Sequence, residues 1–444
     1  MSTALLTDLY ELTMLDGALR SGVAGHRAAF EVFARQLPPG RRYGVVAGTT
    51  RLVPLIEEFR FGAGEIDYLR QLGVLSEATL EWLRGFRFSG DVSGFAEGEL
   101  YFPETPVLTV EAPFGEALLL ETLVLSVLNH DSAVASAGAR MVAAARGRPL
   151  IEMGGRRTHE EAAVAAARAA WVVGFAATSN LEAGRRYAIP TAGTAAHAFI
   201  LAYPSERAAF EAQIGALGPD TTLLVDTFDV DQGVRDAVDV ARRCGAPGPG
   251  AVRIDSGDLR AESSRVRALL DGLAAEATRI VVSGDLDEYA IEALAGAPVD
   301  AYGVGTSVAT GSGFPTAGFV YKLVAVADAS GTVHGVAKRS IGKETRGGRK
   351  WVTRVLSADG YAVEDRVSTV SYAVEERVST VHGAVGDRMR TLAVPLMIAG
   401  APAGDGWDLD AARRHHAAAR QELPAEGLDL RPGPPAVATT VGEG

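Results

Sequence analysis

The chain has 444 residues, of which 47% are hydrophobic and 22% are charged, and its formal net charge is -12. These values are typical of a folded, soluble protein with room for two domains, and they exclude a disordered chain. The negative charge argues against a nucleic-acid groove built on bulk positive charge. Any anion site must therefore be local, made from a few arginines and backbone amides.

The single cysteine, Cys244, excludes a disulfide framework within the chain and favours a reducing compartment. The first residues carry acids and no basic segment ahead of an apolar run, so they do not resemble a secretory signal peptide. No charge-free window reaches the length of a membrane span. We therefore expect a cytoplasmic protein with no membrane partner.

The first 115 residues combine short helical and strand patterns and predict an α+β segment. Apolar residues over 5–20 recur at helical spacing, with Thr7 or Asp8 as the N-cap. Residues 28–37 and 92–102 alternate as half-buried strands do.

The sequence from about residue 116 predicts long helices. Residues 116–147 form one long apolar run, and Asn129-His130-Asp131 predicts a break within it. A second helix is expected over 158–174, where Thr158 and Glu161 have the spacing of a capping box.

Four short apolar runs follow, and each ends at a polar or glycine-containing break. They cover residues 221–225, 251–254, 279–282 and 299–303. A helical pattern follows at least the first three, and their spacing of roughly 20–30 residues is that of a β-loop-α unit. Parallel strands joined in this way form an α/β barrel or an open sheet, and both bind ligands at the carboxyl ends of the strands. The acidic break after 251–254 therefore lies where such folds place their chemistry.

The C-terminal part, beyond about residue 325, reads as antiparallel strands with hairpin turns. Residues 361–371 are almost repeated as 372–382, which indicates a local tandem duplication on the surface. The tail over 422–444 is rich in Pro, Gly and Ala and predicts disorder.

Two glycine-containing breaks predict an anion cradle, because each exposes backbone N–H groups near the start of a helix. They are Ser283-Gly284-Asp285 and Gly303-Val304-Gly305-Thr306-Ser307. Neither is a dinucleotide fingerprint or a Walker loop, and each taken alone is more often a tight turn. Arg156 and Arg157 follow a Gly-Gly pair and could meet phosphate oxygens; a solvated pair at a helix entrance is the alternative.

Two further residues stay ambiguous on the sequence alone. His197 lies among small and apolar residues, a setting that favours a packed core histidine over a catalyst. Tyr10 fits either the core or an aromatic lid on a flat ligand. His130 and His159 lack a metal-ligand partner at helical spacing, so a zinc site is not expected.

Eight ordered motifs give the chain a family resemblance. They are "TDLYELTM", "LLLET", "EMGGRRTH", "GTAAH", "VDTFD", "VRIDSGDL", "VSGDLDE" and "YGVGTS", between residue 7 and about 325. In this set the chain resembles the nicotinate phosphoribosyltransferase family, which belongs to the type II phosphoribosyltransferases.

The resemblance implies an irregular α/β barrel with an additional α+β domain formed from both chain ends. The chain would divide into an N-terminal α+β segment (1–115), a barrel with the active site (116–325), a C-terminal segment completing the α+β domain (326–421) and the disordered tail (422–444). It also implies a homodimer with its active sites at the subunit interface.

The implied reaction joins nicotinate to phosphoribosyl pyrophosphate, gives nicotinate mononucleotide and pyrophosphate, and is coupled to ATP hydrolysis, with Mg²⁺ as cofactor. By this resemblance His197 accepts a phosphoryl group from ATP and Asp255 holds the ribose hydroxyls. The metal ligands are not assigned. Further residues are expected to bind the substrates: Tyr10 of the partner subunit, stacked on the pyridine ring, Arg156 on a phosphate or diphosphate, Ser179 and Thr194, Arg253 on the nicotinate carboxylate, and Gly284, Asp285, Gly305 and Thr306 on the 5′-phosphate.

Alternatives remain at this point. Related nicotinamide-using enzymes carry an aspartate where Ser179 stands, and an aspartate would repel a carboxylate, so nicotinate is preferred over nicotinamide. Quinolinate, a dicarboxylate, would need more basic residues around its ring. A catalytically inactive, nucleotide-binding member is the alternative of another class, although His197, Asp255 and Arg253 are all present.

Overall fold

The computed structural model describes residues 2–338, 345–370, 388–404 and 408–442. The chain divides into two compact units, Met1–Ser136 with Phe314–Gly444, and Ala137–Gly313. Within the described residues, no helix is long and apolar enough to cross a membrane.

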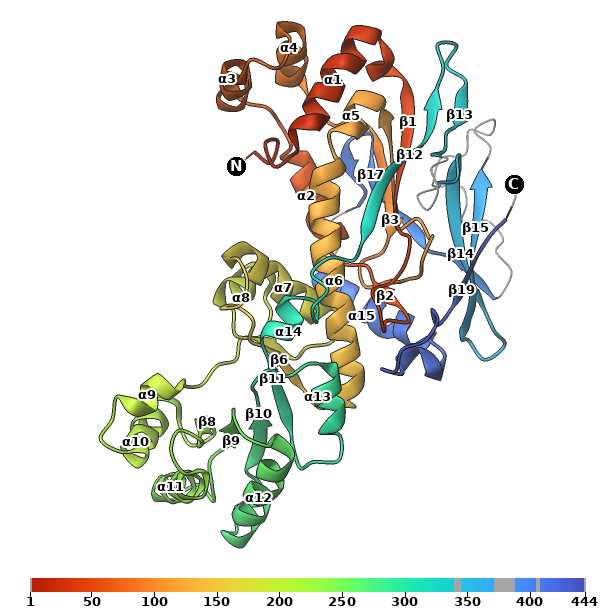
Figure 1. Cartoon of the computed structure of the whole chain (residues 1–444). Coiled ribbons are helices and arrows are strands. Elements are labelled where there is room, and N and C mark those ends of the chain that lie inside the picture. The colour runs from red at the N-terminus through yellow and green to blue at the C-terminus, as the bar shows by residue number, and fades with distance from the viewer. Residues whose placement is uncertain (1, 339–344, 371–387, 405–407, 443–444) are drawn as a thin grey trace. The chain divides into compact units, whose positions relative to one another are not determined.

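The first unit is α+β and contains strands from both ends of the chain. Its main sheet is antiparallel, in the order β13-β12-β1-β5-β3-β17-β18, so C-terminal strands flank N-terminal ones (Figure 1). These strands are β1 (Arg27–Ala34), β3 (Asp91–Phe95), β5 (Leu108–Pro113), β12 (Phe319–Ala327), β13 (Val333–Gly335), β17 (Ala393–Ile398) and β18 (Ala401–Pro402).

Helices and two smaller sheets complete this unit. The helices are α1 (Leu9–Ser21), α2 (Thr49–Glu57), α3 (Ala63–Leu72), α4 (Glu77–Gly85), α5 (Phe114–Leu118), the first part of α6 (Glu121–Ala145), and α15 (Leu409–Gln421), with 3-10 turns η1 (Val23–Gly25) and η3 (Ala425–Leu428). The small sheets pair β2 (Gly44–Val45) with β4 (Leu100–Tyr101), and order β16 (Met389–Thr391), β14 (Arg349–Leu356), β15 (Ala362–Val370) and β19 (Ala438–Val441) as β16-β14-β15-β19.

Two local expectations for this region are corrected. Helix α6 continues through Asn129-His130-Asp131, because the buried Asp131 carboxylate is paired with Arg51 at 2.9 and 3.0 Å and so has no need of solvent. The predicted disorder of the tail is also corrected for residues 422–442. Leu423, Leu430 and Val437 are buried, and β19 adds in parallel to β15, a partner that composition does not reveal. The second copy of the duplication, 372–382, lies outside the described residues.

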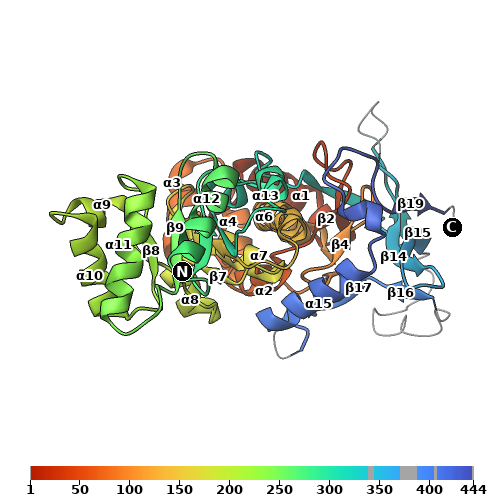
Figure 2. The same cartoon turned by 90° about the horizontal axis from the view of Figure 1, so that it is seen from below.

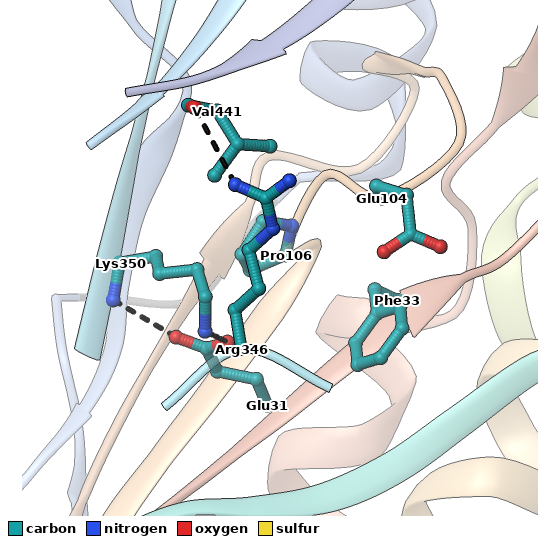
Figure 3. Close-up of a pocket in the computed structure, with 7 residues that line it drawn as sticks. All are labelled: Glu31, Phe33, Glu104, Pro106, Arg346, Lys350 and Val441. Atoms are coloured by element: carbon teal, nitrogen blue, oxygen red, sulfur yellow. Dashed lines mark hydrogen bonds and ion pairs between the residues drawn. The ribbon is translucent and has the colours of Figure 1, made fainter. Parts of the chain in front are cut away.

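A pocket marks the junction between the N-terminal and C-terminal strands of this unit (Figure 3). Lys350 of β14 donates to Glu31 of β1 at 2.7 Å, and Arg346 donates to the backbone oxygen of Val441 at 3.4 Å. The lining residues are Glu31, Phe33, Glu104, Pro106, Arg346, Lys350 and Val441. The buried Lys350–Glu31 pair therefore ties β14 to the main sheet.

The second unit is a parallel α/β fold. Its curled six-stranded sheet has the order β7-β6-β11-β10-β9-β8, and every pairing is parallel. The strands are β6 (Leu150–Glu152), β7 (Ala177–Thr178), β8 (Thr222–Leu224), β9 (Ala251–Ile254), β10 (Arg279–Val282) and β11 (Ala301–Val304). The expected irregular α/β barrel with an additional α+β domain is thus confirmed, with the barrel present as an open, curled sheet.

Helices alternate with these strands, and α10 and α11 lie side by side next to β8 (Figure 2). They are α7 (Glu160–Val172), α8 (Leu181–Tyr187), α9 (His197–Leu201), α10 (Glu206–Leu217), α11 (Val230–Arg243), α12 (Leu259–Gly272), α13 (Glu288–Ala293) and α14 (Thr306–Ala309). Aspartates cap the helices that follow β8, β9 and β10: Asp229, Asp258 and Asp287 accept backbone N–H groups of the first turn. Helix α7 is capped by His159 rather than by Thr158.

Candidate active site

The carboxyl edge of the parallel sheet collects most of the predicted site residues, because strands that run the same way end at the same edge. The strand order sets the order of these residues along the edge. They are Ser179 after β7, Arg156 after β6, Gly305 and Thr306 after β11, Gly284 and Asp285 after β10, and Asp255 after β9. All of them belong to the second unit.

His197 stands over this edge at the first position of α9. Its Nδ1 is 3.1 Å from the hydroxyl of Thr227. Its Nε2 is 4.0 Å from Oδ1 of Asp226 and 3.9 Å from Oδ2 of Asp255. The side chain is 40% exposed. The prediction of a packed core histidine, which its apolar neighbours favoured, is therefore wrong. The imidazole is instead accessible and flanked by two carboxylates.

Asp226 is the buried partner in this arrangement, with a side chain only 1% exposed. Its Oδ2 accepts the backbone N–H of Asp255 and the hydroxyl of Ser256, both at 2.8 Å. Its Oδ1 is buried and has no hydrogen-bond partner among the described residues. A buried acceptor without a donor is uncommon, and this one points toward His197.

Arg253 joins the His197 segment to the sheet. Its Nε donates to Ser283 at 3.0 Å, Nη1 to the backbone oxygen of Ala195 at 3.1 Å, and Nη2 to Asp255 at 3.5 Å. Ser283 also donates to the same Asp255 oxygen. The guanidinium is therefore fixed in place, with its side chain 15% exposed, and Asp255 is held by two neighbouring side chains.

The turn after β10 passes close to the end of β9. Gly284 has φ +104°, and a β-carbon there would lie 2.4 Å from the backbone oxygen of Asp255. Asp285 also has a positive φ, 38°, so two successive residues are left-handed. Both are exposed, as is Thr306 at the start of α14. The backbone at Gly284 and Asp285 thus forms the tight turn that was the alternative interpretation. The residues of this turn are nevertheless exposed on the surface.

The other predicted residues make no direct contact with His197 among the hydrogen bonds and ion pairs of the described residues. Arg156 and Ser179 are exposed in the turns after β6 and β7, and Thr194 is exposed just before α9. Tyr10 belongs to the first unit, on α1, where it is 44% exposed. Burial and nearby carboxylates, first that of Glu121, raise the pKa of Tyr10 to about 12.

Sequence reasoning missed three acidic residues around the edge. Asp226 stands two residues after the end of β8, and Asp255 stands one residue after the end of β9, a similar position that could have identified it. Glu152 ends β6 and is 1% exposed. Glu206, 6% exposed, begins α10, and burial followed by the charge of Asp236 raises its pKa to about 7, while the backbone N–H of Thr227 opposes that rise.

Comparison with known proteins decides the family. The model of the nicotinate phosphoribosyltransferase (NAPRTase) N-terminal domain matches residues 5–129. Nicotinate phosphoribosyltransferase pncB1 of Mycobacterium tuberculosis is 55% identical over 443 residues, which cover 98% of this chain and 94% of that protein. The chain belongs to the nicotinate phosphoribosyltransferase family. A more distant member, the human nicotinate phosphoribosyltransferase, is 32% identical over 424 residues, covering 81% of this chain and 78% of the human protein.

Solved structures agree with this membership. The crystal structure of human nicotinic acid phosphoribosyltransferase superposes with a TM-score of 0.82 at 26% identity, covering 98% of this chain and 97% of that one. Nicotinate-nucleotide pyrophosphorylase from Pyrococcus furiosus shares the fold, with a TM-score of 0.73 at 24% identity over 94% of each chain. The nicotinate phosphoribosyltransferase fold therefore extends over both units of this chain.

Proposed function

We propose that this chain is a nicotinate phosphoribosyltransferase that makes nicotinate mononucleotide and pyrophosphate from nicotinate and phosphoribosyl pyrophosphate, with ATP hydrolysis coupled through a phosphohistidine at His197. Family membership supports the transfer reaction. The observation that carries the rest is an accessible imidazole whose Nε2 faces Asp226 and Asp255 at 4.0 and 3.9 Å. The reaction would supply the salvage route to NAD, in the cytoplasm.

The ribosyl transfer uses the sheet edge. The ring nitrogen of nicotinate forms a bond to C1 of the ribose while the bond from C1 to the pyrophosphate oxygen breaks. Positive charge develops on the ribose, and the carboxylate of Asp255 stabilises it while holding the ribose hydroxyls. The 5′-phosphate lies on the backbone N–H groups near Gly284, Asp285, Gly305 and Thr306.

ATP coupling uses His197 as the nucleophile. In the tautomer that carries its proton on Nδ1, the atom 3.1 Å from the Thr227 hydroxyl, the ring keeps a lone pair on Nε2, which attacks the γ-phosphorus of ATP as ADP leaves. The carboxylates of Asp226 and Asp255 stabilise the positive charge that the ring gains. Water later hydrolyses the phosphohistidine to release phosphate, and the added charge in the meantime orders the site for the ribosyl donor.

Mg²⁺ fits this edge as a companion of the diphosphates. Among the described residues, no group of three acidic, histidine or cysteine side chains forms a ready metal site. Mg²⁺ instead commonly takes one or two carboxylates together with substrate phosphates. The unpartnered Oδ1 of Asp226 and the carboxylate of Asp255 would hold it, and it would neutralise charge on the departing pyrophosphate.

Substrate choice is assigned to the pyridine end of the site. Arg253 would meet the nicotinate carboxylate, Arg156 the diphosphate, and Thr194 a substrate oxygen. Ser179 tolerates a carboxylate where an aspartate would repel it. Tyr10 of the partner subunit would stack on the ring, which makes the active form a homodimer.

The test uses the purified chain with labelled phosphoribosyl pyrophosphate, with and without ATP. Nicotinate should be converted faster than nicotinamide or quinolinate, and ATP should add the mass of one phosphate to the protein. H197A should remove that mass, whereas H334A, at an exposed histidine of the first unit, should retain it. Turnover of nicotinamide but not nicotinate would refute the substrate assignment, and a phosphate retained in H197A would refute the phosphohistidine.

A further inference from the structure

Glu152 ends β6 with a buried carboxylate whose two oxygens bind two different turns. Its Oε1 accepts the backbone N–H of Gly154, and its Oε2 accepts the hydroxyl of Thr178 at 2.5 Å. The side chain is 1% exposed. Burial raises the pKa of this carboxyl, and the hydrogen bonds from Thr178 and Gly154 oppose that rise.

The first contact fixes the turn that carries Arg156. Gly154 opens this turn, and its backbone oxygen accepts the N–H of Arg157 at 2.8 Å. A β-carbon on Gly154 would lie 2.8 Å from the Glu152 carboxylate and 3.0 Å from the backbone oxygen of Gly305. The start of the turn is therefore packed between the carboxylate and the start of α14, and a side chain would not fit there.

The second contact fixes the turn that carries Ser179. Thr178 is the last residue of β7, and its hydroxyl also accepts the N–H of Asn180 at 3.0 Å. The N–H of Ser179 donates to the backbone oxygen of Glu152 at 2.8 Å. One residue thus holds the Ser179 turn by its main chain and, through Thr178, by its side chain.

We propose that Glu152 is a positioning residue that sets the Arg156 turn and the Ser179 turn together, so that one carboxylate couples the grip on the diphosphate to the choice of pyridine substrate. A carboxylate offers two acceptor oxygens in a fixed fork, whereas an amide offers one acceptor and one donor. Glutamine could still accept from Gly154 and donate to Thr178, whereas methionine, of similar length, has no oxygen for either contact. The proposal rests on the proposed function for the roles of Arg156 and Ser179, and on the geometry alone for the coupling.

The kinetic test compares E152M, which removes both contacts, with T178V, which breaks only the contact on the Ser179 side. E152M should raise the KM for phosphoribosyl pyrophosphate and lower the preference for nicotinate over nicotinamide, each by about tenfold, the loss expected for one buried hydrogen bond at each turn. T178V should lower the preference alone and leave that KM within about twofold. E160Q, at an exposed carboxylate in the first turn of α7, should change neither quantity. If E152M moves only one of the two quantities, or only the thermal midpoint, the proposal is overturned.

Amide hydrogen exchange in the unliganded protein gives a second reading that needs no substrate. E152M should speed exchange at Gly154 and Asn180 by about tenfold, while Ser179, bonded to the main-chain oxygen of residue 152, should keep its protection. Unchanged exchange at Gly154 and Asn180 would overturn the coupling. If the wild-type chain fails to turn over nicotinate, the proposed function fails, and the exchange result still decides the role of Glu152. Should E152M fold poorly, the same measurements on T178V and E152D replace it.

Discussion

Glu206 makes the stability of the chain depend on pH in an unusual direction. Its carboxyl is 6% exposed, and burial raises its pKa from an ordinary value of 4.5 to about 7, with the negative charges of Asp236, Asp226 and Asp229 adding to the rise. Below pH 4.5 the group is protonated in the folded and unfolded chains alike and has no effect. Between pH 4.5 and 7 the unfolded chain ionises first, so folded stability falls as pH rises; above pH 7 the loss is constant.

The size of this effect follows from the pKa difference, since a tenfold change in proton affinity is worth about 1.4 kcal/mol. The ionised group therefore destabilises the folded chain by about 3 kcal/mol above pH 7. E206Q removes the charge and keeps the size of the side chain. Its gain in stability should be about 2 kcal/mol larger at pH 8 than at pH 5.5.

Urea unfolding of the wild type and E206Q at the two pH values measures this difference. E211Q is the matched control, because Glu211 is an exposed carboxylate on the same helix, and it should give the same result at both pH values. An E206Q effect that does not change between pH 5.5 and 8 would refute the reasoning that burial holds a proton on Glu206.

Three further outcomes are expected. R354M should destabilise the first unit by about 3–5 kcal/mol in thermal unfolding, because Arg354 is fully buried and its removal takes away the ion-pair partner of the buried Asp365 carboxylate; an unchanged midpoint would contradict this. G284A should lower kcat and cost about 1–3 kcal/mol of stability, because φ is +104° and the new β-carbon meets a neighbouring backbone oxygen; wild-type kcat would show that the turn can relax. Y10A and H197A, each inactive alone, should recover activity when mixed as subunits, since one hybrid site is intact; no recovery would argue against a shared site.

Four of the six strands of the parallel sheet were predictable because they are short apolar runs that stop abruptly, whereas β6 and β7 were not predicted. The runs 221–225, 251–254, 279–282 and 299–303 match β8, β9, β10 and β11 within a residue or two. The polar or glycine-containing breaks after these runs also predicted that Asp255, Gly284 and Thr306 lie at one edge of the sheet, because the carboxyl ends of parallel strands lie at the same edge.

The remaining features depend on partners that are distant in sequence. A helix break is predicted at Asp131 because its ion-pair partner, Arg51, is 80 residues away in the sequence and cannot be recognised from it. The composition of the tail predicts disorder because it does not show that β19 pairs with the edge of β15. The apolar neighbours of His197 predict a core residue, because they carry no information about Asp226 and Asp255. Glu152 was not singled out from the sequence, because its hydrogen bond to Thr178 is set by a tertiary contact.

The interleaved main sheet of the first unit has a consequence for how the protein is made. Strands β1, β3 and β5 leave the ribosome early, but their neighbours β12 and β17 are synthesised only after the whole of Ala137–Gly313. The inserted unit, whose strand pairs are all internal, can fold during translation, while the N-terminal strands must wait with open edges. A nascent chain that stops before residue 319 should therefore need a chaperone to cover β1.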